Sequence, residues 1–309
     1  MAIEPSVSRQ RNVVLCYFVA TRPAFLSVTF CAVLLGLATA SSSAPLDLGK
    51  AIATLLFALC AHAGVNVLND YYDALNGADA ANRERLFPFT GGSRIIQNGV
   101  LSARSMAVFG YTLLALVIPA GLWLTAVSTP ALLLIGLAGL LLGWAYSAPP
   151  LQLMCRDLGE IAIATCWWLV VVGSDLVQRG HFESLPMIAG VSYALLVVNV
   201  LYINQFPDRV ADAAVGKRTL VVRLGPGAAR WGYALIGLGA HGWLLFAILA
   251  GMLPASAALA LLTLMPTQLA ALALIRHAAT PARLVPAIVL TIAAANLHGI
   301  VLAATIAKL

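Results

Sequence analysis

The chain has 309 residues, of which 61% are hydrophobic and 10% are charged, with a formal net charge of +6. A soluble domain carries about 25% charged residues, so this composition excludes a large soluble core and indicates a polytopic membrane protein. The basic excess is a topology signal and not a nucleic-acid footprint, because no basic and aromatic patch accompanies it. The five cysteines form no C-x-x-C pair, so neither a disulfide framework nor a zinc site is expected.

The sequence predicts one domain, residues 1–309, made of membrane-spanning helices. A spanning helix needs about 20 apolar residues. A polar tail, 1–11, precedes the first segment, and Arg22-Pro23 separates a short interfacial helix from its spanning part, because proline suits a first helical position. The expected segments are 12–41, 49–75, 102–127, 130–147, 158–178, 185–207, 226–252, 254–277 and 283–306. We therefore expect an all-α bundle of about nine transmembrane helices around a central polar cavity.

Basic residues are distributed unevenly among the expected loops. If the tail and the loops after the second, fourth, sixth and eighth spans share a side, that side carries 15 of the 18 basic residues. Only Lys50, Arg179 and Lys308 then lie on the other side. The positive-inside rule places the N-terminus and the polar cavity in the cytoplasm and the C-terminus outside. We expect an integral protein of a bacterial inner membrane.

The second span ends in a run of acids and amides between Asn66 and Asp79. At about 100° per residue, Asn66, Asp70 and Asp73 project from one helix face, with Asn69 at its edge. Carboxylates at the end of a membrane helix are costly unless they bind something. A single acid at a helix end is usually just solvated, but a matched set on one face favours a functional site.

The sixth span repeats this pattern. Asn204, Asp208 and Asp212 follow one another at i, i+4 and i+8, again on one helix face. The N-x-x-x-D spacing of Asn204 and Asp208 is the same as that of Asn66 and Asp70 in the second span. Two such acidic helix ends predict one site built by two helices.

Basic residues follow both acidic stretches. Arg94, next to Gly91-Gly92, follows the first, and Lys217 and Arg218 follow the second. Magnesium binds through one or two carboxylates together with substrate phosphates, and basic side chains hold phosphate oxygens. Acids and bases together predict a metal–diphosphate ligand and ionisation at a carbon–diphosphate bond. Acids alone would indicate a cation channel or an ion-coupled transporter, which commonly has them near the bilayer midplane.

These motifs resemble those of a known family. Asn69-Asp70-x-x-Asp73 resembles the N-D-x-x-D signature of UbiA-type intramembrane aromatic prenyltransferases, and Asp208-x-x-x-Asp212 with the following Gly216–Leu220 is similar to their second motif. Arg22-Pro23, and Tyr146 followed by a proline pair, also fit, and the agreement covers nearly the whole chain.

One position departs from the longer form of the first motif. The last acid of that form would fall at residue 77, which is Gly77 here, and Asp79 and Thr90–Arg94 follow instead. This pattern is similar to the branch that acts on 1,4-dihydroxy-2-naphthoate in menaquinone synthesis. Asp79 either replaces the missing acid or organises the loop. 4-Hydroxybenzoate and homogentisate remain alternative acceptors.

The resemblance implies a role for each motif residue. Mg²⁺ would be held by Asn69, Asp70, Asp73, Asp79, Asp208 and Asp212. A polyprenyl diphosphate would be held by Arg22, Asn66, Asn69, Arg94, Asn204, Lys217 and Arg218. Tyr146 would act with the four motif aspartates as a catalytic residue, facing the allylic cation or orienting the aromatic acceptor. The prenyl tail would occupy an apolar tunnel open to the lipid bilayer.

Other polar and aromatic residues favour structural roles. Polar residues inside membrane helices commonly bond to neighbouring helices, which we expect of His62, His241, His298, Asn199 and Asn296. Trp167 and Trp168 are expected to pack between helices or lie at an interface. Asp157 and Glu160 open the fifth span, where acids suit the positive helix end. At the opposite end of the bundle we expect a solvated loop that contains Asp175, Arg179, His181 and Glu183.

Overall fold

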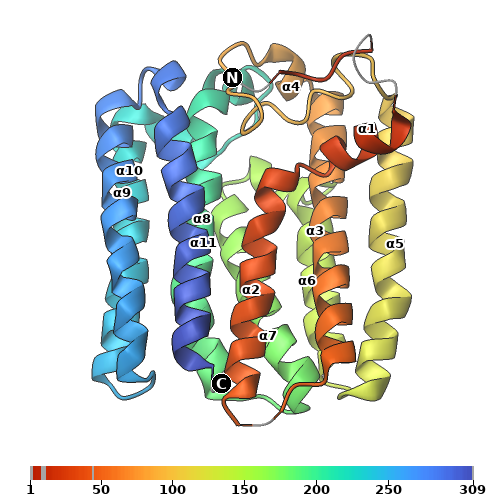
Figure 1. The fold of residues 1–309 in the computed structure, drawn as a ribbon. Helices are drawn as coiled ribbons and strands as arrows, with labels where there is room; N and C mark the ends of the chain where they lie inside the picture. Colours follow the sequence, from red (N-terminus) through yellow and green to blue (C-terminus); the bar gives the residue numbers. More distant parts are fainter. Residues whose placement is uncertain (1–2, 8–11, 44, 308–309) are drawn as a thin grey trace.

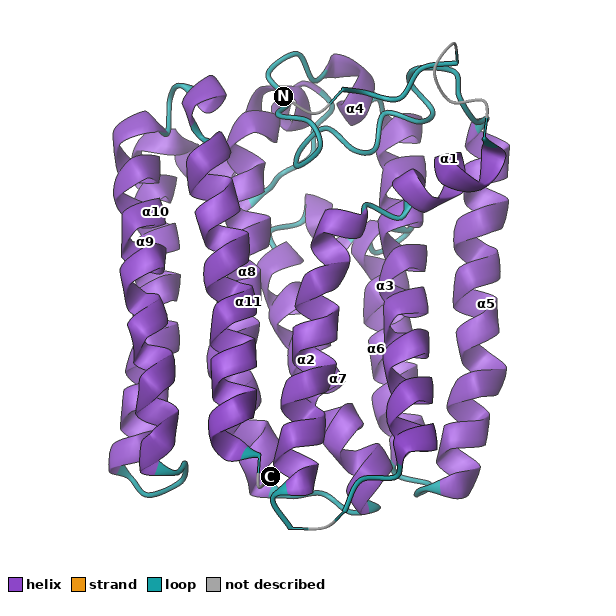
Figure 2. Ribbon diagram, viewed as in Figure 1, coloured by secondary structure: helices purple, strands orange, loops and turns teal. Residues whose placement is uncertain are grey.

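The computed structural model describes residues 3–7, 12–43 and 45–307. The tail residues Arg9 and Arg11 and the terminal Lys308, which the orientation argument uses, lie outside the described residues. The helices are α1 (Val13–Ala20), α2 (Pro23–Ser41), α3 (Leu48–Asn76), α4 (Ala78–Ala81), α5 (Ala103–Val127), α6 (Leu132–Ser147), η1 (Leu153–Cys155), α7 (Gly159–Arg179), α8 (Ser184–Ala214), α9 (Leu220–Leu249), η2 (Ala255–Thr263), α10 (Leu264–His277), η3 (Pro281–Arg283) and α11 (Val285–Ile306). Helices joined by loops make up the described chain, and Figure 2 shows no strand in it.

The prediction of an all-α membrane bundle is confirmed. Within the described ranges, eight helices of 19 to 31 residues are long and apolar enough to cross a membrane, η2 and α10 counting as one. The expected fourth span is present as the shorter apolar helix α6. Its 16 residues reach about 24 Å at 1.5 Å per residue, less than the roughly 30 Å of a bilayer core. The protein is an integral membrane protein.

The long helices run side by side, and the two ends of the described chain lie at opposite ends of the bundle (Figure 1). α4, the loop between α3 and α5, and the N-terminal segment cover one end. Helix α8 is the most buried span and contacts α2, α7, α9 and α11. The largest buried apolar cluster joins α2, α7, α8, α9 and α11 around residues such as Leu35, Tyr193 and Leu302.

The first span is divided as the sequence predicts. Asn12 caps α1 with its Oδ1, which accepts hydrogen bonds from the backbone N–H groups of Val14 and Leu15. Arg22 lies in the left-handed region (φ 55°) and Pro23 opens α2 at its first position. Because the chain turns at Arg22, α1 lies across the end of the bundle instead of continuing α2 (Figure 1).

The sixth and seventh spans differ from the prediction at their junction. We expected a loop over 208–225, but α8 continues to Ala214 with Pro207 inside it, and only 215–219 separate α8 from α9. Pro207 removes one backbone donor, and packing of this long helix outweighs that loss. We expected the seventh span to begin at Pro226. Instead α9 has a kink there, because Gly225 is non-helical (φ 70°) within the helix. Asp208 and Asp212 are therefore held on a helix.

The prediction of a solvated loop over 175–183 is wrong for its first half. Asp175 is 1% exposed and lies in the last turns of α7, where it accepts hydrogen bonds from Arg179 at 2.9 Å and from the Thr39 hydroxyl at 2.8 Å. The i, i+4 spacing lets the helix form this ion pair, and Thr39 ties it to α2. His181 and Glu183 form an exposed pair, as expected.

The predicted interhelical roles of the histidines and asparagines are confirmed. The His62 ring lies 2.8 Å from the Thr29 hydroxyl, which joins α3 to α2. Asn199 donates to the Tyr233 carbonyl, and Asn296 donates to the Ser27 hydroxyl. No disulfide bond joins cysteines among the described residues. Trp168 is fixed between helices by a hydrogen bond from its Nε1 to the Met187 carbonyl.

Candidate active site

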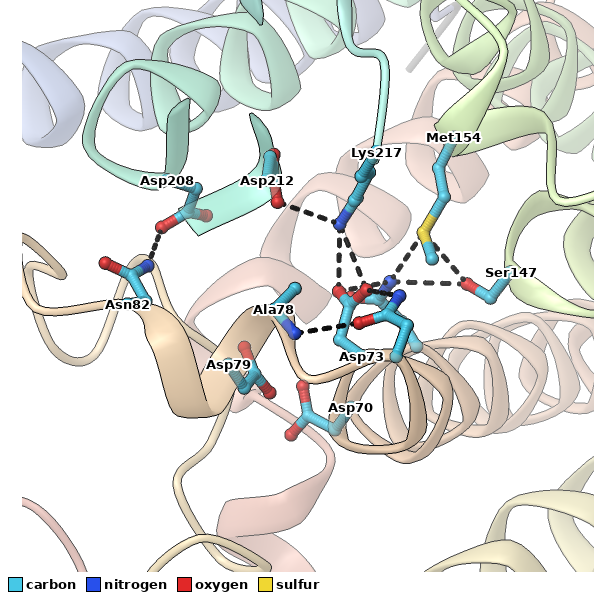
Figure 3. Close-up of polar contacts among 12 residues, drawn as sticks. Asp70, Asp73, Ala78, Asp79, Asn82, Ser147, Met154, Asp208, Asp212 and Lys217 are labelled. Atoms are coloured by element: carbon cyan, nitrogen blue, oxygen red, sulfur yellow. Dashed lines mark hydrogen bonds and ion pairs between the residues drawn. The ribbon is translucent and has the colours of Figure 1, made fainter. Parts of the chain in front are cut away.

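The two acidic motifs meet at one end of the bundle, around a lysine. Asp73 lies in the last turn of α3 and Asp212 in the last turn of α8. Both face Lys217, which belongs to the loop between α8 and α9 (Figure 3). Lys217 Nζ lies 3.0 Å from Asp73 Oδ2 and 3.5 Å from Asp212 Oδ1. A single cation therefore joins carboxylates that stand 139 positions apart in the sequence (73 and 212).

The charge of Lys217 is stabilised by this pairing. Burial disfavours an ammonium ion, but the carboxylates of Asp73 and Asp212 outweigh burial and raise the pKa of Lys217 well above its usual value. Lys217 is thus a fixed positive charge at neutral pH. Lys217 lies between the two motifs and so offers an anionic ligand a positive charge among their carboxylates.

Asp208 is bound by a residue that the motifs do not contain. Asn82, in the loop after α4, donates its Nδ2 to Asp208 Oδ1 at 2.5 Å (Figure 3). Asn82 is 3% exposed and accepts from the Glu84 backbone N–H through its Oδ1. The sequence analysis missed Asn82, since a lone amide in a charged loop gives no periodic signal. Asn82 links the loop after the first motif to the second motif.

Asp79 lies beside Asp70, two positions after Gly77, where the longer form of the first motif would have its last acid. Gly77 ends α3 in the left-handed region (φ 86°), which favours glycine, and turns the chain into α4. Asp79 on α4 then faces Asp70 on α3 (Figure 3). A Cβ atom added to Gly92 would lie 2.4 Å from Asp79 Oδ2 and 3.1 Å from Asp70 Oδ1, so the loop backbone fits closely against both carboxylates.

Asp70 and Asp79 are both buried. Burial raises the pKa of Asp79 well above its usual range, and the negative charges of Asp73, Asp70 and Asp208 add to the effect. The Ser93 backbone N–H donates to Asp70 Oδ2 at 2.8 Å, so this loop amide binds a carboxylate of the protein. We call Asp70, Asp73, Asp79, Asp208 and Asp212 the acid cluster.

Two neutral amides of α3 hold Asp73, and one of them is bound in turn from the α6–α7 side. Asn69 donates to Asp73 Oδ2 at 3.2 Å and also lies 3.2 Å from the Ser147 hydroxyl and from the Met154 sulfur. Asn76 donates to Asp73 Oδ1 at 3.2 Å and accepts from the Ala78 N–H. Ser147 and Met154 come from the end of α6 and from η1. The sequence analysis did not select Asn76, Ser147 or Met154, because nothing in their spacing relates them to α3.

The predicted phosphate-binding cations divide into two groups. Arg22 lines the same cavity as Lys217, and its Nη1 lies 3.9 Å from Asp70 Oδ1. Arg94 is turned away, since its Nη1 donates to the Asp79 carbonyl at 2.5 Å and its Nε faces Glu4 at 3.9 Å. Arg218 is exposed, and its backbone pairs with Arg156. The structure brings Arg22 and Lys217 to the acid cluster and leaves Arg94 and Arg218 outside the cavity lining.

A cavity of about 540 Å³ extends from the acid cluster into the bundle. Its polar end includes Asn66, Asn69, Asn204 and Tyr146, and the rest is lined mainly by apolar residues of α3, α5, α6 and α7. Along α3 the lining runs from Asp73 to Thr54, 19 residues or about 28 Å of helix. Trp167 also lines the cavity, so its side chain forms part of the cavity wall. The shape combines a charged end with a long apolar branch.

The residues at the polar end fit magnesium that is bound together with a phosphate ligand. Asp70 Oδ1 and Asn204 Oδ1 are buried oxygens for which no hydrogen-bond partner is found. Among the described residues, no three His, Cys, Asp or Glu side chains are grouped closely enough to hold a metal ion by themselves. Magnesium commonly uses one or two carboxylates and completes its octahedron with water and substrate phosphates. Five carboxylates beside only two cavity-lining cations leave the net negative charge that such ions neutralise.

Residues 26–291 match the UbiA prenyltransferase family. The chain belongs to this family. It is 28% identical over 210 residues to the 1,4-dihydroxy-2-naphthoate octaprenyltransferase of Bacillus subtilis, a match that covers 66% of this chain and 64% of that protein. It is 30% identical over 225 residues to the enzyme of the same name from Escherichia coli, covering 71% of each. The UbiA prenyltransferase domain-containing protein 1 of Dictyostelium discoideum is 28% identical over 72% of this chain and 66% of that protein.

Solved structures of the family share the fold. A UbiA homologue from Archaeoglobus fulgidus, bound to GPP and Mg²⁺, has a TM-score of 0.61 at 15% identity and covers 93% of this chain and 99% of that one. The apo structure of a homologue from Aeropyrum pernix has a TM-score of 0.59 at 20% identity, over 89% and 96% of the two chains. These likenesses support the helical architecture described above.

Proposed function

We propose that the protein transfers a polyprenyl group from a prenyl diphosphate to an aromatic acceptor, in a reaction that depends on magnesium. The observation that carries this proposal is the meeting of both acidic motifs at Lys217, at the mouth of a cavity whose other end is apolar. A prenyl diphosphate has the same two parts, a multiply charged head and a hydrocarbon tail. The A. fulgidus homologue that binds GPP and Mg²⁺ supports this assignment.

The diphosphate head is assigned to the acid cluster and its two cations. Asn69, Asp70, Asp73, Asp79, Asp208 and Asp212 would hold magnesium, which neutralises the diphosphate and stabilises it as a leaving group. Lys217 and Arg22, both at the cavity wall, would contact phosphate oxygens directly, with Asn66 and Asn204 beside them. Arg94 and Arg218, which we predicted as phosphate ligands, lie outside the cavity lining and make the loop and backbone contacts described above.

Tyr146 is assigned to the reacting carbon. It lines the cavity, and its ring edge packs on the first turn of α7, where a Cβ atom added to Gly159 would lie 3.7 Å from Tyr146 Cε2. Lying at the polar end, the ring can face an allylic carbon that becomes cationic as diphosphate departs. The tail would follow the largely apolar branch of the cavity along α3.

The acceptor that we propose is 1,4-dihydroxy-2-naphthoate, which loses its carboxyl group as a lipoquinone precursor of the menaquinone type is formed. The relatives named for this acceptor, from Bacillus subtilis and Escherichia coli, support it at 28% and 30% identity. The replacement of an acid at residue 77 by Gly77 and Asp79 supports the same branch. 4-Hydroxybenzoate and homogentisate are the competing acceptors.

Purified protein in detergent or liposomes tests this proposal. It is incubated with a polyprenyl diphosphate, magnesium and each acceptor in turn, and products are scored by mass. We expect prenylated, decarboxylated naphthoate and release of diphosphate only when both substrates and magnesium are present, with loss of turnover in excess chelator. Ion flux across the liposomes without product would instead indicate the transporter alternative.

The proposed orientation places the acid cluster in the cytoplasm of a bacterial cell. It rests on the positive-inside rule applied to the loops that surround α4 and the α8–α9 junction. A reporter fused to the C-terminus is expected to be active only outside the cytoplasm. A cytoplasmic signal would reverse the orientation.

A further inference from the structure

Glu160 is a carboxylate in the cavity wall that belongs to neither acidic motif. It lies in the first turn of α7 and lines the cavity together with Tyr146 and Gln205. In the described part of the chain, Glu160 forms no ion pair. A carboxylate that faces a largely apolar cavity without a cation is costly unless hydrogen-bond donors from the protein or from a ligand satisfy it.

The orientation of Glu160 is set by Gln205. The amide of Gln205 accepts from the Val221 backbone N–H through Oε1, so its Nε2 is the donor to Glu160 Oε1, at 2.7 Å. This contact joins α7, α8 and the start of α9. It occupies one carboxylate oxygen, and among the described residues no further side chain donates a hydrogen bond to Glu160. The Glu160 backbone N–H also bonds to this carboxylate, which keeps further lone pairs for a donor from the cavity.

The charge of Glu160 selects the kind of partner. A diphosphate or a carboxylate would be repelled by it and attracted to Arg22 and Lys217, which lie at the acid cluster. A neutral hydroxyl group, by contrast, donates a strong hydrogen bond to a carboxylate. The Tyr146 ring, which packs on the same turn of α7, gives a flat surface for an aromatic ring.

We propose that Glu160 is the catalytic residue that binds the ring hydroxyl of the aromatic acceptor and accepts its proton. This inference rests on the proposed prenyl transfer and assigns the acceptor's side of the site. The hydroxyl points to Glu160, and any carboxyl group of the acceptor points away from it, toward the cations. The ring is thereby placed between Glu160 and the diphosphate end of the cavity.

The step balances with the groups present. The O–H bond breaks and its proton passes to Glu160, and the electron pair left on oxygen makes the ring nucleophilic. A bond forms between a ring carbon and the allylic carbon, while the allylic C–O bond breaks and its pair leaves on the diphosphate. The ring regains aromaticity when that carbon loses its carboxylate as CO₂; the pair of the broken C–C bond returns to the ring oxygen, which takes back the proton from Glu160.

The test compares Glu160→Gln with wild type on 1,4-dihydroxy-2-naphthoate and on its two mono-O-methyl ethers, with a polyprenyl diphosphate and magnesium. A hydrogen bond to a charged group is worth about 10- to 100-fold, so Glu160→Gln is expected to lose at least about tenfold in kcat/KM for the free naphthoate. The KM for the prenyl diphosphate should stay within about twofold. One ether should be a poor substrate for wild type and be affected little by the substitution.

The control is Asp157→Asn, which removes a carboxylate three residues earlier. Asp157 pairs with the exposed Arg223 and does not line the cavity, so its loss should change kcat/KM by less than about twofold. If Glu160→Gln fails to insert, Glu160→Asp carries the same measurements. Equal losses on the free naphthoate and both ethers, or a parallel rise in the KM for prenyl diphosphate, would overturn the assignment. An inactive wild type would overturn the prenyl-transfer proposal itself.

Discussion

Two groups of polar side chains are buried in this bundle, and they are satisfied to very different degrees. Ser192, His241, Thr263 and His298, here called the histidine network, join α8, α9, η2 and α11. Each ring nitrogen of the two histidines has a partner within 3.1 Å, and Thr263 Oγ1 contacts both rings. Because a carbonyl oxygen only accepts, the 2.8 Å contact to the Gly237 carbonyl places a proton on His241 Nδ1.

The acid cluster is the opposite case. It crowds five carboxylates near Lys217 and Arg22, and it leaves the buried oxygens Asp70 Oδ1 and Asn204 Oδ1 without a hydrogen-bond partner. A fully bonded polar network makes the bundle rigid and specific, whereas an incomplete one costs stability. The difference fits a packing role for the histidine network and, in the function proposed above, a ligand of positive charge and phosphate at the acid cluster.

Removing an acid should cost turnover and spare stability. Asp208→Ala deletes a carboxylate held only by neutral side chains such as Asn82, and it relieves repulsion within the acid cluster. We expect prenyl transfer to fall by at least about a hundredfold, since a preorganised charge contact in the transition state is lost. The thermal midpoint in detergent should be unchanged or higher. Near-normal turnover, or a large drop in the midpoint, would break the distinction drawn here.

The loop beside the acid cluster offers a matched pair of glycines. Gly92→Ala puts a Cβ atom 2.4 Å from Asp79 Oδ2, whereas a Cβ atom on Gly99 meets nothing within 4 Å. Both glycines have a positive φ, near 70°, so both substitutions carry about 1 kcal/mol of backbone strain. Only Gly92→Ala should displace the carboxylate and lower turnover, by about ten- to a hundredfold. Equal activity of the two variants in the transfer assay would show that the fit against Asp79 is irrelevant.

The histidine network should respond in the reverse sense. Thr263→Val keeps the side-chain volume and removes the hydroxyl that His241 Nε2 and His298 Nδ1 share. Leaving these ring nitrogens unpaired should cost about 1–3 kcal/mol of unfolding free energy, with turnover unchanged well below the melting temperature. Thr305→Val, whose hydroxyl bonds only to the Leu302 carbonyl, is the control and should change stability little. A loss of turnover in Thr263→Val at full stability would contradict a packing role.

The sequence predicted the helices and the motif acids because both follow a period along one helix. Hydrophobic runs predict membrane spans, and Asn66, Asp70 and Asp73 repeat at helical spacing. The partners of these acids come from other elements, so no period relates them: Asn82 reaches Asp208 from a loop, and Met154 reaches Asn69 from η1.

Charge alone did not predict where two arginines and one ion pair would lie in the fold. Arg94 and Arg218 have the residue type and position of phosphate ligands, but their directions depend on the loop backbone, which composition does not encode. Asp175 looked solvated because it lies near a loop in the sequence. Its burial depends on Thr39 of α2, a contact that becomes visible only when the helices are packed.

The smallest expected effect concerns the N-terminal segment that holds the loop over the acid cluster. Glu4 accepts from Arg85 at 2.7 Å and from Asn98 at 3.3 Å, and the hydrogen bond from Arg85 lowers the pKa of Glu4. The contacts of ionised Glu4 therefore stabilise the fold at a pH above the ordinary carboxyl pKa. This stabilisation is lost as the pH falls through the lowered pKa of Glu4.

Because Glu4 is partly exposed, Glu4→Gln should cost less than about 1 kcal/mol at pH 7. The expected readout is about two- to fivefold faster amide hydrogen exchange across residues 85–98, with exchange in α11 unchanged. If the histidine network and the acid cluster are coupled only weakly, Glu4→Gln should not change the stability that the histidine network contributes. A parallel increase of exchange around Thr263 would show instead that the bundle opens as one unit.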